Sequence, residues 1–366
     1  MDFINLEFLK KYLSEKIISR LWERGKEWLD LQKLESEYKK TLKEVFEKPL
    51  PLDEDLGVSL KEVYTDPEGV KDLISNQSLE SKGVSDLIWD RWENNQNSFI
   101  LLLGQPGGGK SSLIKKLSYD WAENNREPYP KKVFERNLYT VQLRHLPEEF
   151  KDDPVKVLTD YLRGEYDPPH DPFLWDEEVI YLFKDYKNSI LLLDGLDEFV
   201  MNYQLTEEET KNLLEKLADG LSKYNCKVLI TSRPNYLSKE HLRDLNRRLG
   251  YTVWELQPFN LEEINAFLDK YKRTLEEKYE YQKRVNPENP PKVYFENFNL
   301  LKERVKENLR EKEPLVDQPL LLYMLAHLYL REGKTPQIGK DIDLYEELIN
   351  AVIQSCLLYT SPSPRD

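Results

Sequence analysis

Short apolar runs alternate with longer amphipathic stretches through the middle of the chain. The apolar runs occupy residues 98–103, 138–143, 189–194, 227–231 and 252–256. Runs of this length, separated by stretches that repeat about every 3.6 residues, are typical of strands buried between layers of helices. The pattern predicts an α/β fold whose core, residues 98–258, is a mainly parallel sheet flanked by helices.

Helical periodicity also precedes this core. Apolar residues recur at helical spacing through residues 1–48, and Pro49 and Pro51 then end the pattern. We expect residues 1–52 to form an N-terminal helical segment with a role in support or association. Residues 53–97 are predicted to be a linker that contains a short strand at 58–64 and a helix at 84–95.

Residues 259–355 lack the alternation of a sheet and are predicted to form an all-helical subdomain. Its expected helices span 261–280, 298–309, 319–331 and 344–354. Inside the core, residues 145–187 contain several prolines and are predicted to be an insertion.

The first predicted strand runs directly into a glycine-rich segment and then a helix. In this context glycines let backbone N–H groups turn toward phosphate oxygens, and the positive end of the helix faces the same anion. We expect Lys110 to contact the β- and γ-phosphates of a nucleotide and the Ser111 hydroxyl to bind Mg²⁺. The predicted nucleotide-binding residues are Gly104, Gln105, Pro106, Gly107, Gly108, Gly109, Lys110, Ser111 and Ser112.

Carboxylates follow the third predicted strand. Asp194 ends the apolar run 190–193, and Asp197 and Glu198 come shortly after it. A carboxylate at such a strand end can hold Mg²⁺, so Asp194 is predicted to be a metal ligand together with Ser111. A further acid can orient or deprotonate the attacking water, and the sequence leaves this role open between Asp197 and Glu198.

The fourth predicted strand ends in Thr231-Ser232-Arg233-Pro234. Because the carboxyl ends of parallel strands meet at one edge of a sheet, Arg233 is expected near the same site, where it can bind the γ-phosphate. An ordinary helix-capping turn explains the same residues, and the spacing does not separate the two interpretations.

Composition narrows the class of protein. The chain has 366 residues, a formal net charge of −14 and no apolar run of transmembrane length. The negative charge argues against general affinity for nucleic acid or anionic membranes. A local basic patch at Lys270, Lys272 and Arg273 is an alternative to a solvated helix face.

A single cysteine before residue 356, Cys226, favours a reducing cytoplasm. The last segment, 356–366, resembles a translated sequencing adapter and is expected to be foreign to the fold.

The three motifs together resemble the NACHT group of STAND P-loop ATPases. The residues that carry the resemblance are Gly-Gln-Pro-Gly-Gly-Gly-Lys-Ser-Ser (104–112), Leu-Leu-Leu-Asp-Gly-Leu-Asp-Glu (191–198) and Thr-Ser-Arg-Pro (231–234). Similarity extends over about residues 58–355 and includes Ser59-Leu60-Lys-Glu-Val-Tyr64, Gln318-Pro319-Leu-Leu-Leu and Asp343-Leu-Tyr345-Glu-Glu-Leu.

The resemblance implies an ASCE/AAA+-like fold and a nucleotide-controlled switch. Bound ADP would hold a closed monomer, and ATP with Mg²⁺ would permit assembly into an oligomer. Pro319 would contact the adenine, although a proline in the first helical turn needs no nucleotide, and Arg144 would lie near the nucleotide. The family's winged-helix unit and sensor repeats are not recognisable, so the chain is expected to be a C-terminally truncated fragment in which His327 packs on an apolar helix face.

The sequence therefore predicts an ATP-binding, slowly hydrolysing switch that self-associates when full length, in defence or stress sensing. An AAA+-like ATPase motor with continuous turnover is one alternative. A nucleotide-binding scaffold without catalysis is the other. The stimulus, the sensor ligand and the effector output are not indicated by any motif.

Overall fold

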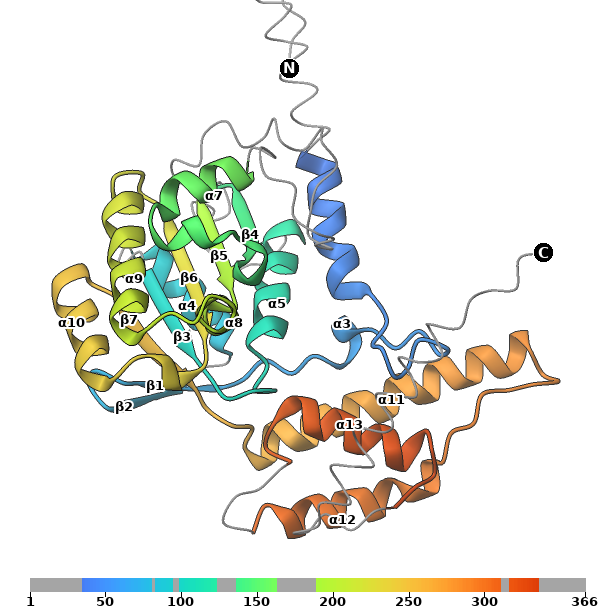
Figure 1. Cartoon of the computed structure of the whole chain (residues 1–366). Coiled ribbons are helices and arrows are strands. Elements are labelled where there is room, and N and C mark those ends of the chain that lie inside the picture. Colours follow the sequence, from blue (N-terminus) through green and yellow to red (C-terminus); the bar gives the residue numbers. More distant parts are fainter. Residues whose placement is uncertain are drawn as a thin grey trace, which may run out of the picture.

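The computed structural model describes residues 35–80, 83–94, 99–123, 136–162, 189–310 and 316–335. These residues form a seven-stranded sheet in the order β2-β1-β7-β3-β6-β5-β4 (Figure 1). The five predicted strands are confirmed to within one residue at each end, and they are parallel to one another. They are β3 (Phe99–Leu103), β4 (Leu138–Gln142), β5 (Ile190–Asp194), β6 (Lys227–Ser232) and β7 (Thr252–Leu256).

The strand order brings the three sequence motifs to one edge of the sheet. β6 lies between β3 and β5, with Leu103 opposite Ser232 and Leu193 opposite Ile230. The phosphate loop follows β3, the acidic segment follows β5, and Arg233 follows β6. Since parallel strands share the direction of their carboxyl ends, all three segments emerge side by side.

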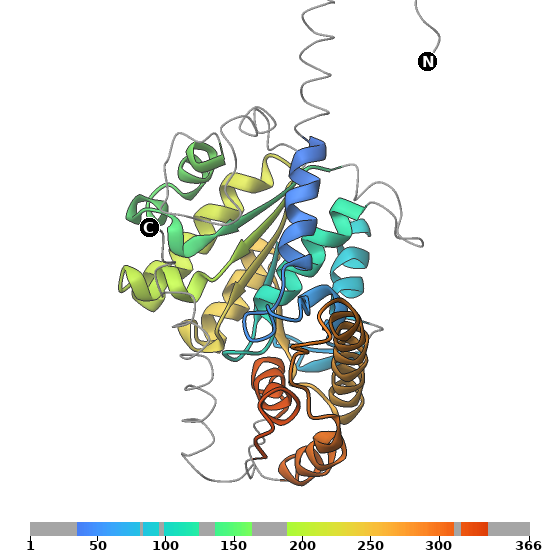
Figure 2. The same ribbon diagram turned by 90° about the vertical axis from the view of Figure 1, so that its right-hand side faces the viewer.

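Helices cover both faces of the sheet (Figures 1 and 2). On one face lie α4 (Val84–Glu93), α5 (Lys110–Glu123) and the helical residues 35–47; on the other lie α7 (Pro154–Leu162), α9 (Glu207–Ser222) and α10 (Lys239–Leu249). The strands between them are buried along nearly their whole length, as the continuous apolar runs predict.

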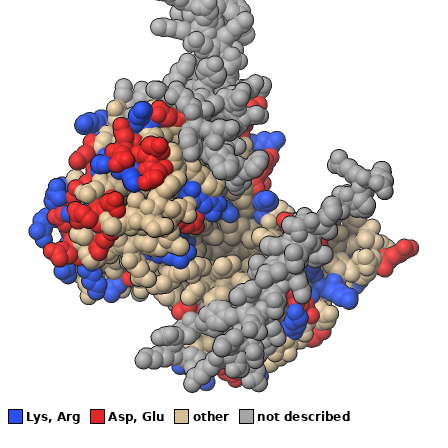
Figure 3. Space-filling view, in the orientation of Figure 1, with Lys and Arg blue, Asp and Glu red and all other residues tan. Residues whose placement is uncertain are grey.

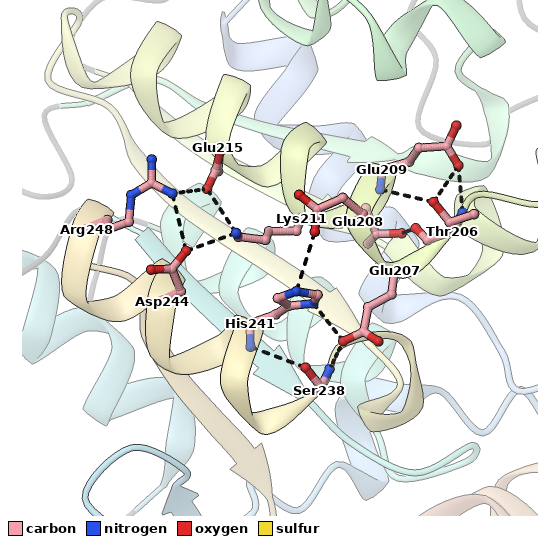
Figure 4. Close-up of polar contacts among 11 residues, drawn as sticks. Thr206, Glu207, Glu208, Glu209, Lys211, Glu215, Ser238, His241, Asp244 and Arg248 are labelled. Carbon is pink, nitrogen blue, oxygen red and sulfur yellow. Dashed lines mark hydrogen bonds and ion pairs between the residues drawn. The ribbon is translucent and has the colours of Figure 1, made fainter.

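Polar contacts join α9 to α10 at the surface (Figure 4). Arg248 pairs with Glu215 at 2.8 Å, Lys211 with Asp244 at 3.0 Å, and the His241 Nδ1 atom with Glu207 at 2.7 Å. Surface pairs of this kind contribute little to stability, because solvent and salt screen their charges. The contact at His241 lies at the start of α10, where the Glu207 carboxylate also accepts the Ser238 backbone N–H, so it holds the segment that follows Arg233 against α9.

The helical subdomain contains α11 (Leu261–Val285), α12 (Phe298–Asn308) and α13 (Pro319–Leu330), which confirms three of the predicted helices. It has an apolar core of its own, built around residues such as Leu268, Leu301 and Leu325. Among the residues that the structure describes, no helix has both the length and the apolar character needed to cross a bilayer. The predicted helix 344–354, residues 1–34, most of the insertion and the segment 356–366 lie outside the described residues.

The predicted strand at 58–64 is wrong. Its residues form a short helix, α3 (Leu60–Val63), and only Ser59 makes an isolated bridge, to Pro49. Ser59 and Glu62 form a capping box, in which the Glu62 carboxylate accepts hydrogen bonds from the Ser59 backbone N–H at 2.8 Å and from its hydroxyl at 3.0 Å. This local pairing outweighs the β-propensity of Val58 and Val63.

A hairpin in the predicted linker was missed. Strands β1 (Gly69–Asp72) and β2 (Gln77–Glu80) extend the sheet beyond β7, and both pairings are antiparallel. The Asp72 carboxylate accepts hydrogen bonds from the backbone N–H groups of Ile74 and Ser75, both at 2.9 Å, which closes the turn between the two strands.

Candidate functional site

A cavity of about 330 Å³ lies between the carboxyl edge of the sheet and the helical subdomain. Figure 3 shows this side of the molecule, where a hollow opens between the two parts and its visible surface is mostly uncharged. Among the predicted site residues, those that line the cavity are Pro106, Gly107, Gly108, Gly109, Lys110, Ser111, Ser112, Asp194, Asp197, Glu198, Arg233 and Pro319. Gly104 and Gln105 begin the same loop and contact Lys110 instead.

The glycine-rich loop has the backbone that the sequence implies. Gly107 and Gly109 have φ values of +74° and +90°, a region that residues with a Cβ atom rarely adopt. The loop then enters α5 at Lys110, and the Leu113 N–H bonds the Gly109 carbonyl at 2.9 Å. The first N–H groups of α5 therefore face the cavity without partners inside the helix, as anion binding requires.

The ammonium group of Lys110 lies inside the loop. It donates hydrogen bonds to the carbonyl oxygens of Gly104 at 2.6 Å and Gln105 at 3.0 Å. Burial lowers the pKa of Lys110, and the charges of Asp197 and Asp194 oppose that effect only in part. A phosphate group would favour the charged form of this lysine, because it adds an anion to a site poor in water.

Asp194 ends β5 with its carboxylate held by β6. Its Oδ1 atom accepts a hydrogen bond from the Thr231 hydroxyl, whose oxygen in turn accepts the Gly195 N–H at 3.0 Å. Asp194 and Ser111 line the same cavity. A carboxylate and a hydroxyl are oxygen donors of the kind that Mg²⁺ takes from proteins alongside nucleotide phosphates, so these residues fit the predicted metal.

The two remaining acids have different surroundings. The Gly195 backbone, at φ +81°, turns the chain so that Asp197 and Glu198 fall in the first turn of α8 (Leu196–Asn202). The Asp197 side chain is only 5% exposed and pairs with the Arg233 Nε atom at 2.9 Å. The Glu198 side chain is 44% exposed and lies 3.3 Å from an Arg144 guanidinium nitrogen. Arg144 thus lies beside the site, as the resemblance implies.

Helix α13 contacts the phosphate loop directly. Its Leu320 N–H donates a hydrogen bond to the Gly107 carbonyl at 3.3 Å. Pro319 is the first residue of α13, as the helix interpretation requires, and it also lines the cavity. Its contact with an adenine stays a prediction. The helical subdomain and the phosphate loop therefore lie next to each other in the wall of the cavity.

Residues before the sheet complete the apolar end of the cavity, and the sequence did not indicate them. Leu50, Leu60, Val63, Tyr64, Thr65 and Pro67 lie there together with Phe259, Phe267, Leu320 and Tyr323. Thr65 is 8% exposed, and its hydroxyl has no hydrogen-bond partner among the described residues. A buried hydroxyl in a cavity wall is suited to bind a polar group on a flat, mostly apolar ligand.

His327 and the residues of the candidate basic patch do not line the cavity at the phosphate loop. His327 is buried, as its predicted packing role requires, but the group it faces is polar: its Nδ1 atom lies 3.2 Å from the Asp53 carboxylate. Lys270 donates to the Tyr64 carbonyl at 2.7 Å, and Lys272 pairs with Glu276 at 3.3 Å. These contacts fit a helix face whose lysines bind neighbouring groups of the chain.

Comparisons with known proteins agree with this geometry. The family model described as NACHT domain matches residues 98–274. The chain is 26% identical over 240 residues to nucleotide-binding oligomerization domain-containing protein 2 of Bos taurus, covering 59% of this chain and 21% of that protein. The Homo sapiens protein of the same name is 25% identical over 188 residues, covering 48% and 16%. The chain thus matches only about a fifth of the length of these relatives.

Solved structures give weaker likenesses. A closed-state cryo-EM reconstruction of Hsp104 with FITC casein has a TM-score of 0.41 and 16% identity, covering 81% of this chain and 46% of that chain. The extended conformation of the S. cerevisiae Hsp104:casein complex has a TM-score of 0.39 and 14% identity, covering 67% and 37%.

The family match spans the phosphate loop, the acidic end of β5, Arg233 and the first half of α11. The order of the parallel strands, the loop after β3 and the acids after β5 are those of a P-loop NTPase. The chain is a NACHT-domain protein with a P-loop NTPase fold and a helical subdomain after the sheet.

Proposed function

We propose that the protein is an ATP-binding, slowly hydrolysing switch that couples its nucleotide state to self-association. One observation carries the proposal. A single cavity joins the phosphate loop, the acids after β5 and Arg233 to the first turn of α13. A nucleotide whose phosphates lie at Lys110 and whose base lies against Pro319 and Tyr323 would therefore touch both the core and the helical subdomain.

The contact between α13 and the loop favours a switch. The Leu320 N–H bonds the Gly107 carbonyl, within the loop that would receive the phosphates. Any change in that loop on exchange of ADP for ATP would reach α13 without an intermediate element. The difference in free energy between the ADP-bound and ATP-bound states then depends on the contacts that each nucleotide makes with the sheet core and with the helical subdomain.

The chemistry follows from the side chains in the cavity. Lys110 would bind the β- and γ-phosphates, and Arg233 would neutralise charge as the γ-phosphate leaves. Glu198 would accept a proton from the attacking water while the bond between the γ-phosphorus and the bridging oxygen breaks and ADP departs. Mg²⁺, held by Ser111 and Asp194, would supply charge neutralisation at the phosphates.

Self-association and biological role are proposed on the family resemblance. The name of the Bos taurus relative contains the words nucleotide-binding and oligomerization, which supports both parts of the proposal. A role in defence or stress sensing rests on the same resemblance. A reducing compartment such as the cytoplasm suits the buried thiol of Cys226, which forms no disulfide among the described residues.

Calorimetric titration with ADP and with ATP–Mg²⁺, followed by steady-state turnover, tests the proposal. We expect binding of both nucleotides and turnover well below one per second. A turnover on the order of 1 per second or more would support an AAA+-like motor instead. Binding without any cleavage would support a scaffold, and absence of binding would refute all three functions.

The Thr65→Val variant tests where the base lies. It keeps the shape of the side chain and removes the one buried hydroxyl that lacks a partner in the cavity wall. We expect ADP affinity to fall about fivefold, the effect of losing one hydrogen bond of about 1 kcal/mol. Inorganic pyrophosphate, which has no base, should bind as it does to the wild type.

Thr159→Val is the matched control, because the Thr159 hydroxyl donates to the Val155 carbonyl of its own helix and Thr159 does not line the cavity. Unchanged ADP affinity in Thr65→Val, or an equal loss for pyrophosphate, would place the base elsewhere.

A further inference from the structure

A buried carboxylate behind the cavity holds several polar side chains of the helical subdomain. Asp53 is fully buried, and four side-chain groups converge on it. Its Oδ2 atom accepts hydrogen bonds from the hydroxyls of Tyr271 at 2.8 Å and Tyr323 at 3.0 Å. Its Oδ1 atom lies 3.2 Å from both the His327 Nδ1 atom and the Arg331 Nε atom.

These partners belong mainly to one helix. Tyr323 and His327 lie four residues apart on one face of α13, and Arg331 caps its end on the same face. The other end of α13 carries Leu320, bonded to the Gly107 carbonyl. The helix is therefore bound at its start by the phosphate loop and along its length by Asp53.

The segment that carries Asp53 is itself fixed. The Leu50 N–H bonds the Val58 carbonyl at 2.7 Å, and the Asp53 carbonyl accepts the Gly57 N–H at 2.9 Å, which closes a compact loop. The helical residues 35–47 before this loop pack on α5, with the rings of Phe46 and Tyr119 5.1 Å apart. Since α5 starts at Lys110, Asp53 links the core on the side of the phosphate-loop helix to α13.

The charge balance is consistent with an ionised Asp53. Burial by itself would raise the pKa of this carboxyl, but the hydrogen bond and charge of His327, with Tyr271 and Arg331, hold it below the ordinary value. A buried carboxylate with four donors keeps its geometry, because moving any one donor leaves a charge incompletely solvated.

We propose that Asp53 is a positioning residue of the nucleotide site, which holds α13 in the register that puts Pro319, Leu320 and Tyr323 into the cavity wall. Asp53 does not line the cavity. It acts through Tyr323, which both lines the cavity and bonds the carboxylate. The inference deepens the proposed function and rests on it where nucleotide binding is concerned.

The Asp53→Asn variant tests the inference. An amide keeps the size of the side chain but replaces one acceptor oxygen with an NH₂ group, so one pair of donors loses its acceptor. We expect ADP affinity to fall roughly 3- to 30-fold, the range found for residues that couple two sites without touching the ligand. Pyrophosphate affinity should stay within about twofold of the wild type, because pyrophosphate needs the phosphate loop but not the base end of α13.

Hydrogen exchange of the full chain gives a second measurement that needs no nucleotide. In Asp53→Asn we expect amides of residues 319–330 to exchange faster, while those of α5 keep their protection. If the wild type binds no ADP, the proposed function fails, and the exchange result still decides whether Asp53 holds α13.

Two further variants separate positioning from general loss of structure. Asp55→Asn is the control, since Asp55 is 57% exposed and contacts only Arg331 among the same residues, and it should bind ADP as the wild type does. Tyr271→Phe removes one donor from outside the cavity lining and should weaken ADP in the same direction, which keeps the test open if Asp53→Asn does not fold. Equal weakening of ADP and pyrophosphate binding, or unchanged protection of residues 319–330 in both Asp53→Asn and Tyr271→Phe, would overturn the inference.

Discussion

Lys110→Ala is expected to lose about 2–5 kcal/mol of nucleotide binding, which is about 30-fold to several thousand-fold in affinity. The lysine is the cation at the centre of the phosphate loop, and its side chain is partly buried. Burial lowers its pKa, so the free protein already carries a poorly solvated charge whose natural partner is an anion. The alanine substitution removes this positive charge, while the glycine backbone that forms the loop stays intact.

Thermal unfolding with and without ADP measures this effect in one experiment. At a ligand concentration 100 times the wild-type Kd, the wild type should gain about 2.7 kcal/mol of stability, whereas a variant that binds 100-fold more weakly gains only about 0.4 kcal/mol. Lys239→Ala, which removes an exposed lysine of α10 outside the cavity, is the control. An ADP-induced shift in Lys110→Ala equal to that of the wild type would refute the phosphate-loop assignment.

The parallel core could be predicted because its signals are local. A strand that is buried on both faces has a continuous apolar sequence. The predicted ends of β3 to β7 therefore agree with the observed ends to within one residue. The phosphate loop is equally recognisable from a short sequence motif, because few residues other than glycine adopt the left-handed backbone of Gly107 and Gly109. The wrong prediction of a strand at 58–64 also concerns a local signal. The Ser59–Glu62 capping box favours a helix start, and the strand interpretation did not take it into account.

The rest of the site depends on contacts that are distant in sequence. Thr65 and Leu50 line the cavity because α11 and α13, which are distant in sequence, pack against residues 49–65. In the sequence, Asp53 cannot be distinguished from the other acidic residues of a polar linker. Its role becomes visible only in the folded chain, through its contacts with Tyr271, Tyr323, His327 and Arg331. No periodicity or motif encodes such pairs, so only the folded chain brings them together.

The surroundings of Asp197 and Glu198 favour Glu198 as the acid that orients or deprotonates the attacking water, a choice that the sequence left open. Glu198→Gln is expected to keep nucleotide affinity and to slow hydrolysis by roughly 10²- to 10⁴-fold, the contribution of a positioned general base. Glu198 is the more exposed acid in the cavity, and its pair with Arg144 is between exposed groups, which costs at most about 1 kcal/mol to break. Asp197 is buried against Arg233, so it is better suited to hold that arginine than to meet a water molecule.

Single-turnover cleavage of ATP, measured beside ADP affinity and melting temperature, distinguishes the two roles. Glu198→Gln should change only the cleavage rate, because its neutral amide still fits the site but accepts no proton. Asp197→Asn should lower the melting temperature and weaken ATP more than ADP, since it releases Arg233 from its partner. Glu208→Gln, an equally conservative change at an exposed acid of α9, should leave all three quantities unchanged. Normal cleavage in Glu198→Gln together with slow cleavage in a stable Asp197→Asn would reverse the assignment and make Asp197 the residue that positions the water.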